Sequence, residues 1–305
     1  MTKFKGSIVA LATPFKKGKV DFDAFQRLVE WHIASGTHGL VPCGTTGETP
    51  TVPDEEHKRL IDACIEAADG RVPVIAGAGS NSTQEAVDMG RYAEKSGADG
   101  ILVVTPYYNK PMQEGMYQHF KAVNDAVGIP IIMYNVPGRT AVEISVDTVI
   151  RLAALKNIAG IKDASVDLSR PLQLRVALGN EFIQLSGEDA TVAAYLAQGG
   201  HGCISVTANV APKLCADLHN YWQKKDWKNF ERVRDVLSPL HKALFIETSP
   251  SPTKYCLYRL GKCAEELRLP MVPVTAATRQ KLDEAMEFAG LFKVAKKKLK
   301  RVGKR

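Results

Sequence analysis

Eight short apolar runs that alternate with longer amphipathic segments constrain the fold of this chain more than any other feature. The runs occupy residues 7–13, 39–42, 73–76, 100–105, 130–135, 158–162, 182–186 and 203–206. Strands joined by single helices pair in parallel, and strands that are apolar throughout are buried on both faces. We therefore predict an α/β fold of the (β/α)8, or TIM-barrel, type. The competing architecture is an open doubly wound sheet, but no GxGxxG motif follows the first run.

The segments between and after these runs carry helix signals. Asp21 can cap a helix that stops at Gly36, and residues 82–85 form a candidate capping box for a second helix. After residue 206 only helices are expected. The expected proline breaks lie at 211–212, 238–239 and 249–252. The predicted domains are a barrel in 1–209, a C-terminal helical extension in 210–292 and a disordered basic tail in 293–305.

The net charge of +7 resides in that tail. Residues 293–305 hold six Lys, two Arg and no acid, which leaves −1 for the rest of the chain. A basic terminal tail is typical of a solvated end, so we expect no nucleic-acid partner. The six cysteines form no CxxC pair, and no apolar stretch approaches the ~20 residues of a membrane span. We therefore expect a cytoplasmic protein that contacts no membrane.

A lysine ends the sixth apolar run, at the end of a strand where a barrel of this type places its active site. Lys162 follows the apolar residues 158–161 and precedes Asp163. Lysine is seldom buried without a partner, and in a dry pocket its free amine is a nucleophile toward carbonyl groups. An ion pair with Asp163 is the structural alternative, and the strand alone does not decide between the two.

Three other strand ends carry residues suited to a small carboxylate substrate. The loop 44–48 (GTTGE) has two glycines around hydroxyl residues, so its backbone N–H groups can converge on an anion. The fourth run leads into the adjacent Tyr107 and Tyr108, and the fifth contains Tyr134 and is followed by Arg139. Tyrosines can carry protons, and an arginine can clamp a carboxylate. Together with the lysine, these residues predict a site that condenses carbonyl compounds.

Four motifs resemble those of the dihydrodipicolinate synthase family. They are GTTGE at 44–48, PYYNKP at 106–111, YNVPGRT at 134–140 and GIKDAS at 160–165. Their order and spacing match the family, and the resemblance covers roughly residues 3–291. GTTGE and the lysine are shared with N-acetylneuraminate lyase and related aldolases, whereas PYYNKP together with NVPGRT is more specific.

The resemblance implies that pyruvate condenses with L-aspartate 4-semialdehyde to give 4-hydroxy-tetrahydrodipicolinate, in lysine and diaminopimelate biosynthesis. It implies that Lys162 forms an imine with pyruvate and that Tyr134 donates and accepts protons beside it. Thr45 is implied to link Tyr134 to Tyr108, which a neighbouring subunit supplies. No cofactor and no metal are implied, because the imine itself acts as the electron sink.

The resemblance also implies how the substrates are bound. Thr46 and the loop N–H groups would hold the pyruvate carboxylate, and Arg139 would receive the carboxylate of the aldehyde. Gly187 and Ile204 would line the pocket through their backbone.

A homotetramer made of two tight dimers, inhibited by L-lysine, is a further implication. The positions that match the family's lysine site are Thr49, Pro50, Asp54, His57, Asn81, Glu85 and Tyr107. Glu85 can accept the ligand's ammonium group, although it also ends the candidate capping box. Thr49, Pro50 and Asp54 depart from the serine, alanine and histidine common in the family, which leaves the strength of inhibition open.

Two alternative functions are open at this point. Another pyruvate-dependent aldolase of the N-acetylneuraminate lyase superfamily would act on sugar acids, and Arg139 argues against it because a carboxylate clamp suits a short substrate. A barrel that binds small carboxylates without catalysis is the alternative from a different class. Lys162, Tyr134, Thr45 and Tyr108 together argue against that alternative.

Overall fold

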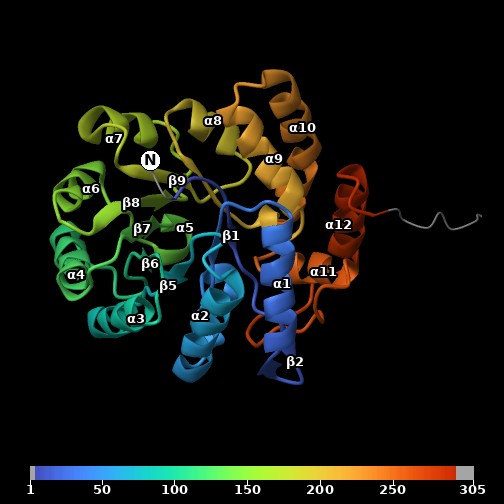
Figure 1. Cartoon of the computed structure of the whole chain (residues 1–305), viewed down its shortest axis with the longest axis horizontal. Coiled ribbons are helices and arrows are strands. Elements are labelled where there is room, and N and C mark those ends of the chain that lie inside the picture. The colour runs from blue at the N-terminus through green and yellow to red at the C-terminus, as the bar shows by residue number, and fades with distance from the viewer. Residues whose placement is uncertain (1–3, 293–305) are drawn as a thin grey trace, which may run out of the picture.

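Eight parallel strands form a barrel in the computed structural model, which describes residues 4–292 (Figure 1). The strands are β1 (Gly6–Ala10), β4 (Gly39–Val41), β5 (Ile75–Gly77), β6 (Gly100–Val104), β7 (Ile131–Asn135), β8 (Ile158–Asp163), β9 (Ile183–Ser186) and β10 (Gly202–Ser205). They neighbour one another in chain order, and a bridge between Leu40 and Val74 joins β4 to the segment that leads into β5. The predicted runs and the predicted TIM barrel are thus confirmed.

Helices follow the strands and cover the outside of the barrel. They are α1 (Phe22–Ala34), α2 (Asp54–Ala68), α3 (Thr83–Lys95), α4 (Gln113–Ala126), α5 (Pro137–Thr140), α6 (Val146–Ala153), α7 (Arg170–Leu178) and α8 (Val192–Ala197). The predicted cap of α1 is confirmed, because the Asp21 carboxylate accepts a hydrogen bond from the N–H of Ala24 at 3.0 Å. Short 3-10 helices, η1 (Thr45–Gly47), η2 (Thr49–Thr51) and η3 (Thr207–Asn209), occupy two of the loops.

Only half of the capping box predicted for α3 is present. The Ser82 hydroxyl accepts a bond from the N–H of Glu85 at 3.4 Å, as expected. The Glu85 carboxylate, however, accepts from the hydroxyl of Ser80 at 2.6 Å, and the N–H of Ser82 donates to that same hydroxyl at 3.1 Å. Glu85 therefore has the predicted position in the helix, but the Ser80 hydroxyl links its carboxylate to the N–H of Ser82 in place of a direct hydrogen bond.

Two short strands that the sequence pattern did not indicate follow β1. They are β2 (Phe15–Lys16) and β3 (Lys19–Val20), which pair in an antiparallel hairpin. Gly18 turns the chain between them with a φ of +77°. Phe15 is fully buried although its strand has only two residues, so this hairpin anchors itself through one aromatic side chain.

Between β10 and residue 292 the chain forms helices only. They are α9 (Pro212–Gln223), α10 (Trp227–Ala243), α11 (Ser251–Arg259) and α12 (Ala276–Phe288). In Figure 1 they lie together on one side of the barrel, with α11 and α12 close to α1. The division of the chain after residue 209 stays a prediction, since α9 packs against β1 as well as α10. The predicted basic tail, 293–305, lies outside the described residues. Within residues 4–292, no helix has both the length and the hydropathy needed to cross a bilayer.

The predicted break at Ser238-Pro239 is wrong. Pro239 lies inside α10, on an exposed face of the helix, while Val233, Leu237 and Leu240 on the other face are buried. A proline in a helix removes one backbone hydrogen bond and strains the turn before it. Apolar packing of this helix outweighs that local effect.

The core has two layers, because successive side chains of a strand point to opposite faces. The interior of the barrel holds Ile8, Leu102, Ile132, Tyr134, Leu185 and Ile204, among others. Neighbours such as Val9, Val103 and Met133 point outward and pack against the helices. This alternation decides which strand-end residues reach the site.

Candidate active site

Lys162 and Tyr134 face each other across two adjacent strands. They are register partners on β8 and β7, and both are buried. The Nζ atom of Lys162 lies 4.0 Å from the centroid of the Tyr134 ring. Within residues 4–292 that amine makes no hydrogen bond or ion pair. An amine with no carboxylate partner, beside a tyrosine at the carboxyl end of a barrel, is available to attack a carbonyl carbon.

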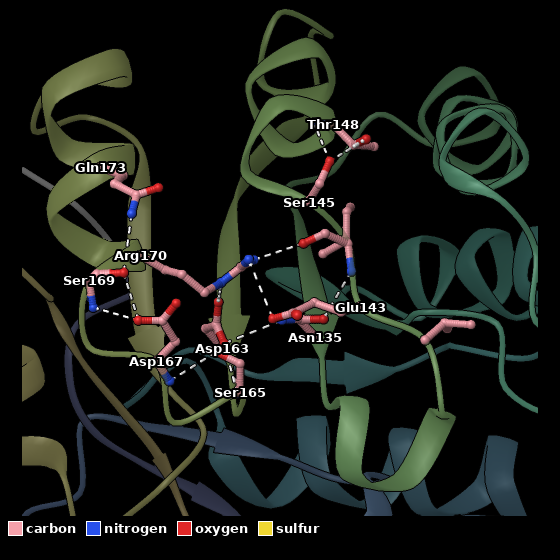
Figure 2. Close-up of polar contacts among 12 residues, drawn as sticks. Asn135, Glu143, Ser145, Thr148, Asp163, Ser165, Asp167, Ser169, Arg170 and Gln173 are labelled. Atoms are coloured by element: carbon pink, nitrogen blue, oxygen red, sulfur yellow. Dashed lines mark hydrogen bonds and ion pairs between the residues drawn. The ribbon is translucent and has the colours of Figure 1, made fainter.

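Asp163, the next residue along β8, points to the opposite face. Figure 2 shows Arg170 reaching from the start of α7 to Asp163, with Asn135 beside the pair. The Asp163 carboxylate accepts from Nε of Arg170 at 2.8 Å, from the N–H of Ser165 at 2.8 Å and from the amide of Asn135 at 3.3 Å. The ion pair between Lys162 and Asp163, left open by the sequence, is therefore wrong.

The same arginine fixes a second segment. Arg170 donates to the carbonyl of Ile144 at 2.8 Å. Its Nη1 atom also lies 3.4 Å from the carboxylate of Glu143, which Figure 2 shows beside it. Asn135 in turn accepts from the N–H of Ile144 at 3.2 Å. One hydrogen-bonded cluster thus joins the ends of β7 and β8 to the segment before α6 and to the start of α7. It lies on the outer face of β8, next to Lys162 in the chain.

Gly187 follows directly after β9, and Ile204 lies near the end of β10. A Cβ atom on Gly187 would come within 2.7 Å of the Cβ of Ala164 and 3.2 Å of Cε of Lys162, so a side chain here would displace the lysine. The N–H of Gly187 donates to the carbonyl of Asp163 at 2.7 Å. Ile204 is fully buried in the barrel interior.

The GTTGE loop closes the site from the side of β4. Thr45 and Thr46 begin η1, so their N–H groups have no acceptor within that helix. Thr46 is buried, and Thr45 lines a cavity of about 650 Å³. The loop is tied to the end of β1 because the hydroxyl of Thr13 donates to the carbonyl of Gly47 at 2.7 Å.

Arg139 lies on α5, directly after β7, and its side chain reaches across the mouth of the site. Its guanidinium donates to the carbonyl of Ser249 in the C-terminal extension at 3.2 Å. The residue is exposed and lines the same cavity as Thr45 and Tyr134. A substrate carboxylate entering this cavity would meet its remaining N–H groups.

Tyr108 does not join this group within the chain. It is 90% exposed and has a φ of +68°, in the left-handed region that tyrosine rarely adopts. Its neighbour Tyr107 is much less exposed and lines the cavity. The chain alone therefore brings together all the predicted catalytic residues except Tyr108.

One cavity of about 650 Å³ runs from the strand ends of the barrel to the groove between α2 and α3. It is lined at the barrel by Thr45, Tyr134 and Arg139. The predicted lysine-site residues that line its outer part are Thr49, Pro50, Asp54, His57, Glu85 and Tyr107. Asn81 is not part of the lining, and its carbonyl accepts a bond from the amide of Asn109 at 2.9 Å.

Two of these side chains are held by contacts inside the loop region. His57 Nε2 lies 2.8 Å from the carbonyl of Gly77, to which it must donate, and burial lowers the pKa of His57, so its ring stays neutral at pH 7. The Thr49 hydroxyl lies 2.6 Å from the carbonyl of Cys43 and 2.7 Å from that of Gly44. The proton of this hydroxyl is therefore shared with the backbone, so the hydroxyl can accept a hydrogen bond from a ligand but has no proton left to donate to one.

No sequence pattern indicated that Lys254 belongs near the site. It is fully buried on α11, and its Nζ lies 3.1 Å from Oε1 of Glu48, the last residue of the GTTGE motif. Lysine is rarely buried in full without a partner. Its neighbours in the sequence, Thr253 and Tyr255, do not indicate that Lys254 is buried. Its partner Glu48 is about 200 residues earlier in the chain, in the barrel. Among residues 4–292, no group of three or more His, Cys, Asp or Glu side chains is placed to hold a metal.

Comparison with known proteins gives one consistent family. The Dihydrodipicolinate synthetase family matches residues 3–289. Over 291 residues the chain is 61% identical to 4-hydroxy-tetrahydrodipicolinate synthase of Bradyrhizobium diazoefficiens, covering 95% of this chain and 98% of that protein.

Two solved structures share the fold. The chloride-inhibited dihydrodipicolinate synthase from Acinetobacter baumannii, complexed with pyruvate, has a TM-score of 0.92 and 45% identity and covers 94% of this chain and 99% of that one. The enzyme from Cyanidioschyzon merolae with lysine bound has a TM-score of 0.93 and 36% identity, over 96% of this chain and 100% of that one.

Proposed function

Because the chain belongs to the dihydrodipicolinate synthetase family, we propose that it is a 4-hydroxy-tetrahydrodipicolinate synthase that condenses pyruvate with L-aspartate 4-semialdehyde in lysine and diaminopimelate biosynthesis. The observation that carries this proposal is the buried Lys162 amine, which lies over the Tyr134 ring at the strand ends of the barrel and has no ion-pair partner among residues 4–292. We place the enzyme in the cytoplasm, where the thiols of its six free cysteines stay reduced.

The reaction begins with attack of the Lys162 amine on the keto carbon of pyruvate, and loss of water gives an imine. The imine withdraws electrons, so a methyl proton leaves and an enamine forms. The enamine carbon attacks the aldehyde carbon, and the aldehyde oxygen takes up a proton. The amino group of the product then displaces Lys162 as the ring closes. Tyr134 transfers protons at each stage, and Thr45 connects it to a second tyrosine.

The proposed binding roles are those that the family resemblance implies, and the positions of the polar groups support them. Thr46 and the N–H groups at the start of η1 hold the pyruvate carboxylate, and Arg139 holds the carboxylate of the aldehyde substrate. Gly187 leaves space beside the lysine, and its backbone and that of Ile204 face the bound pyruvate.

A partner subunit completes the relay in this proposal. Tyr108 is 90% exposed and held in a left-handed conformation, which suits a side chain that inserts into the site of a neighbouring chain. We therefore propose a tight dimer that supplies Tyr108 in trans, and a homotetramer formed from two such dimers.

The test of the reaction is a coupled assay with pyruvate and L-aspartate 4-semialdehyde, run beside N-acetylneuraminate. Borohydride added with pyruvate should attach one pyruvate-derived group to Lys162, because reduction traps the imine. Lys162→Ala should abolish both the adduct and turnover. Lys121→Ala, which removes an exposed lysine on α4 that pairs with Asp125, is the control and should keep both. An adduct on another lysine, or activity only with N-acetylneuraminate, would refute the proposal.

We also propose that L-lysine inhibits the enzyme from the outer part of the cavity. The support is the position of Glu85 in the cavity wall, near Tyr107 and His57, and the lysine bound in the related structure from Cyanidioschyzon merolae. The carboxylate of Glu85 would accept the ammonium group of the ligand.

Glu85→Gln should raise the lysine concentration for half-inhibition by roughly tenfold or more, because it removes a charge-assisted hydrogen bond. Turnover without lysine should stay near the wild-type value. Glu94→Gln is the matched control, since Glu94 lies on the same helix and accepts from the N–H of Gly128, away from the cavity. Absence of lysine binding to the wild type in calorimetry would rule out the site.

A further inference from the structure

A buried ion pair lies behind the GTTGE loop. The Nζ of Lys254 is 3.1 Å from Oε1 of Glu48, and the two side chains are 0% and 2% exposed. Lys254 belongs to α11 in the C-terminal extension, whereas Glu48 ends the loop that holds Thr45 and Thr46. The contact therefore joins the extension to the wall of the active site.

Each end of the pair is held by further contacts. Lys254 also donates to the carbonyl of Glu266 at 2.7 Å, and its Nζ lies 4.4 Å from the centroid of the Phe15 ring. The second oxygen of Glu48 accepts from the N–H of Arg268 at 3.1 Å. Arg268 stacks on Phe15 as well, with its guanidinium carbon 4.4 Å from the ring centroid. The unpredicted hairpin β2–β3, the loop and the extension thus meet around one aromatic ring.

Arg268 binds the loop region at two more points. Its guanidinium donates to the carbonyl of Thr51 at 2.8 Å and forms an ion pair with Glu56 at 2.6 Å. Thr51 follows directly on the GTTGE loop in η2, and Glu56 lies in the first turn of α2. The segment from 48 to 56 is therefore attached to the extension at Glu48, Thr51 and Glu56.

The backbone at Glu48 explains why such an attachment matters. Glu48 has φ +57° and ψ +33°, a left-handed conformation that is unfavourable for a residue with a side chain, and it is the single residue between η1 and η2. On the other side of the loop, the carbonyl of Gly47 is fixed by the hydroxyl of Thr13. With the carboxylate of Glu48 anchored, the N–H groups of Thr45 and Thr46 point in a fixed direction.

Stability alone is a weak reason for this arrangement. Taking two charges out of water offsets most of their mutual attraction, so a buried pair stabilises a fold little compared with apolar residues of similar size. Burial lowers the pKa of Lys254 from its usual value, while Glu48 counteracts that change. The pair has a geometric effect that apolar residues could not supply. It fixes Glu48, a loop residue with a strained backbone, to α11, which is about 200 residues later in the chain.

We propose that Lys254 is a positioning residue for the pyruvate-binding loop, through which the C-terminal extension sets the affinity for pyruvate. The inference rests on the proposed function of the loop. Lys254 touches no reacting atom and acts only through Glu48.

The experiment compares Lys254→Met with the wild type. Methionine fills much of the same volume without the charge, so Glu48 loses its anchor and the loop N–H groups lose their alignment. We expect the KM for pyruvate to rise by roughly tenfold or more, while kcat at saturating pyruvate changes by less than about threefold. The pyruvate concentration needed for half-maximal borohydride trapping should rise by the same factor, in a measurement that does not involve the aldehyde.

Two further variants separate positioning from stability. Arg259→Met removes an ion pair with Asp283 that lies wholly within the extension, so it should lower Tm and leave the KM for pyruvate unchanged. Glu48→Gln with Lys254→Met removes both buried charges and should fold even if the single variant does not. Its KM should be raised as well, because the amide cannot replace the ion pair.

A wild-type KM for pyruvate in a folded Lys254→Met or double variant would overturn the inference. So would an equal rise in the Arg259→Met control. Failure of the proposed function has a different result, namely a wild-type protein that forms no pyruvate adduct at all.

Discussion

The two walls of the active site are supported in different ways. On the wall formed by β7 and β8, Lys162 and Tyr134 are backed by the ion pair of Asp163 with Arg170, seven residues further along the chain. On the wall formed by the GTTGE loop, the supporting cation is Lys254, which comes from the C-terminal extension. Both supports are buried ion pairs, but the first is local in sequence and the second depends on tertiary packing across the chain.

Strand register fixes the side chains of the β7–β8 wall. Because neighbouring residues of a strand point to opposite faces, the outward contact of Asp163 with Arg170 keeps Lys162 pointing into the barrel. The GTTGE loop is not part of a strand, so no register fixes its conformation. Contacts with Lys254 and Arg268 of the C-terminal extension hold it in place instead. Breaking either buried pair should lower stability. Damage to the first wall should also lower turnover, whereas damage to the second should mainly raise the KM for pyruvate.

The largest effect should come from Arg170→Met. It leaves the carboxylate of Asp163 buried without a cation, and breaking a buried pair in this way costs about 3–5 kcal/mol of unfolding free energy. The hydrogen bond to the carbonyl of Ile144 is lost as well. Urea unfolding at pH 7 measures the loss of stability, and the activity per folded molecule should fall because β8 no longer holds Lys162 in place.

Asp163→Asn combined with Arg170→Met serves as the control for that prediction. It removes both charges, so it should recover most of the lost stability. If the single variant were within about 1 kcal/mol of the wild type, the local ion pair would not be a main support of this wall, and the contrast between the two walls would fail.

The same contrast explains what the sequence could predict. All eight strands were predictable because each is an apolar run bounded by turn residues, and the site residues on β7 and β8 follow directly once a barrel is inferred. The alternation of strand side chains could also have separated Lys162 from Asp163, since neighbours on a strand point to opposite faces.

Features that depend on distant contacts were not predictable in this way. The hairpin β2–β3 is stabilised by burial of Phe15 between Lys254 and Arg268, and nothing in residues 15–20 alone indicates those partners. The straight course of α10 through Pro239 depends on packing of its apolar face. The Ser80 hydroxyl donates to the Glu85 carboxylate because the loop after β5 places Ser80 beside the start of α3. Helix-capping rules do not describe the path of that loop.

The smallest expected effect on stability concerns His32, which lies on the helix that packs against the C-terminal extension. It is fully buried on α1, and within residues 4–292 neither ring nitrogen has a hydrogen-bond partner. Burial, with a smaller contribution from the charge of Lys262 in the extension, lowers the pKa of His32 from 6.5 to about 3. Between pH 6.5 and about pH 3, His32 is therefore protonated in the unfolded chain and neutral in the folded chain. Protonation stabilises the unfolded state, so the unfolding free energy falls as the pH decreases through this range.

His32→Leu should remove that dependence. Each such histidine lowers the unfolding free energy by about 1.4 kcal/mol per pH unit within the window, and leucine neither titrates nor leaves polar atoms unpaired. At pH 7 the variant should be as stable as the wild type or slightly more stable, and between pH 6 and pH 5 its unfolding free energy should fall by about 1.4 kcal/mol less. Urea unfolding at the two pH values measures this difference. An unchanged pH dependence would mean that His32 can reach water or a partner in the folded protein, and that the contact between α1 and the extension is looser than the wall on the β7–β8 side.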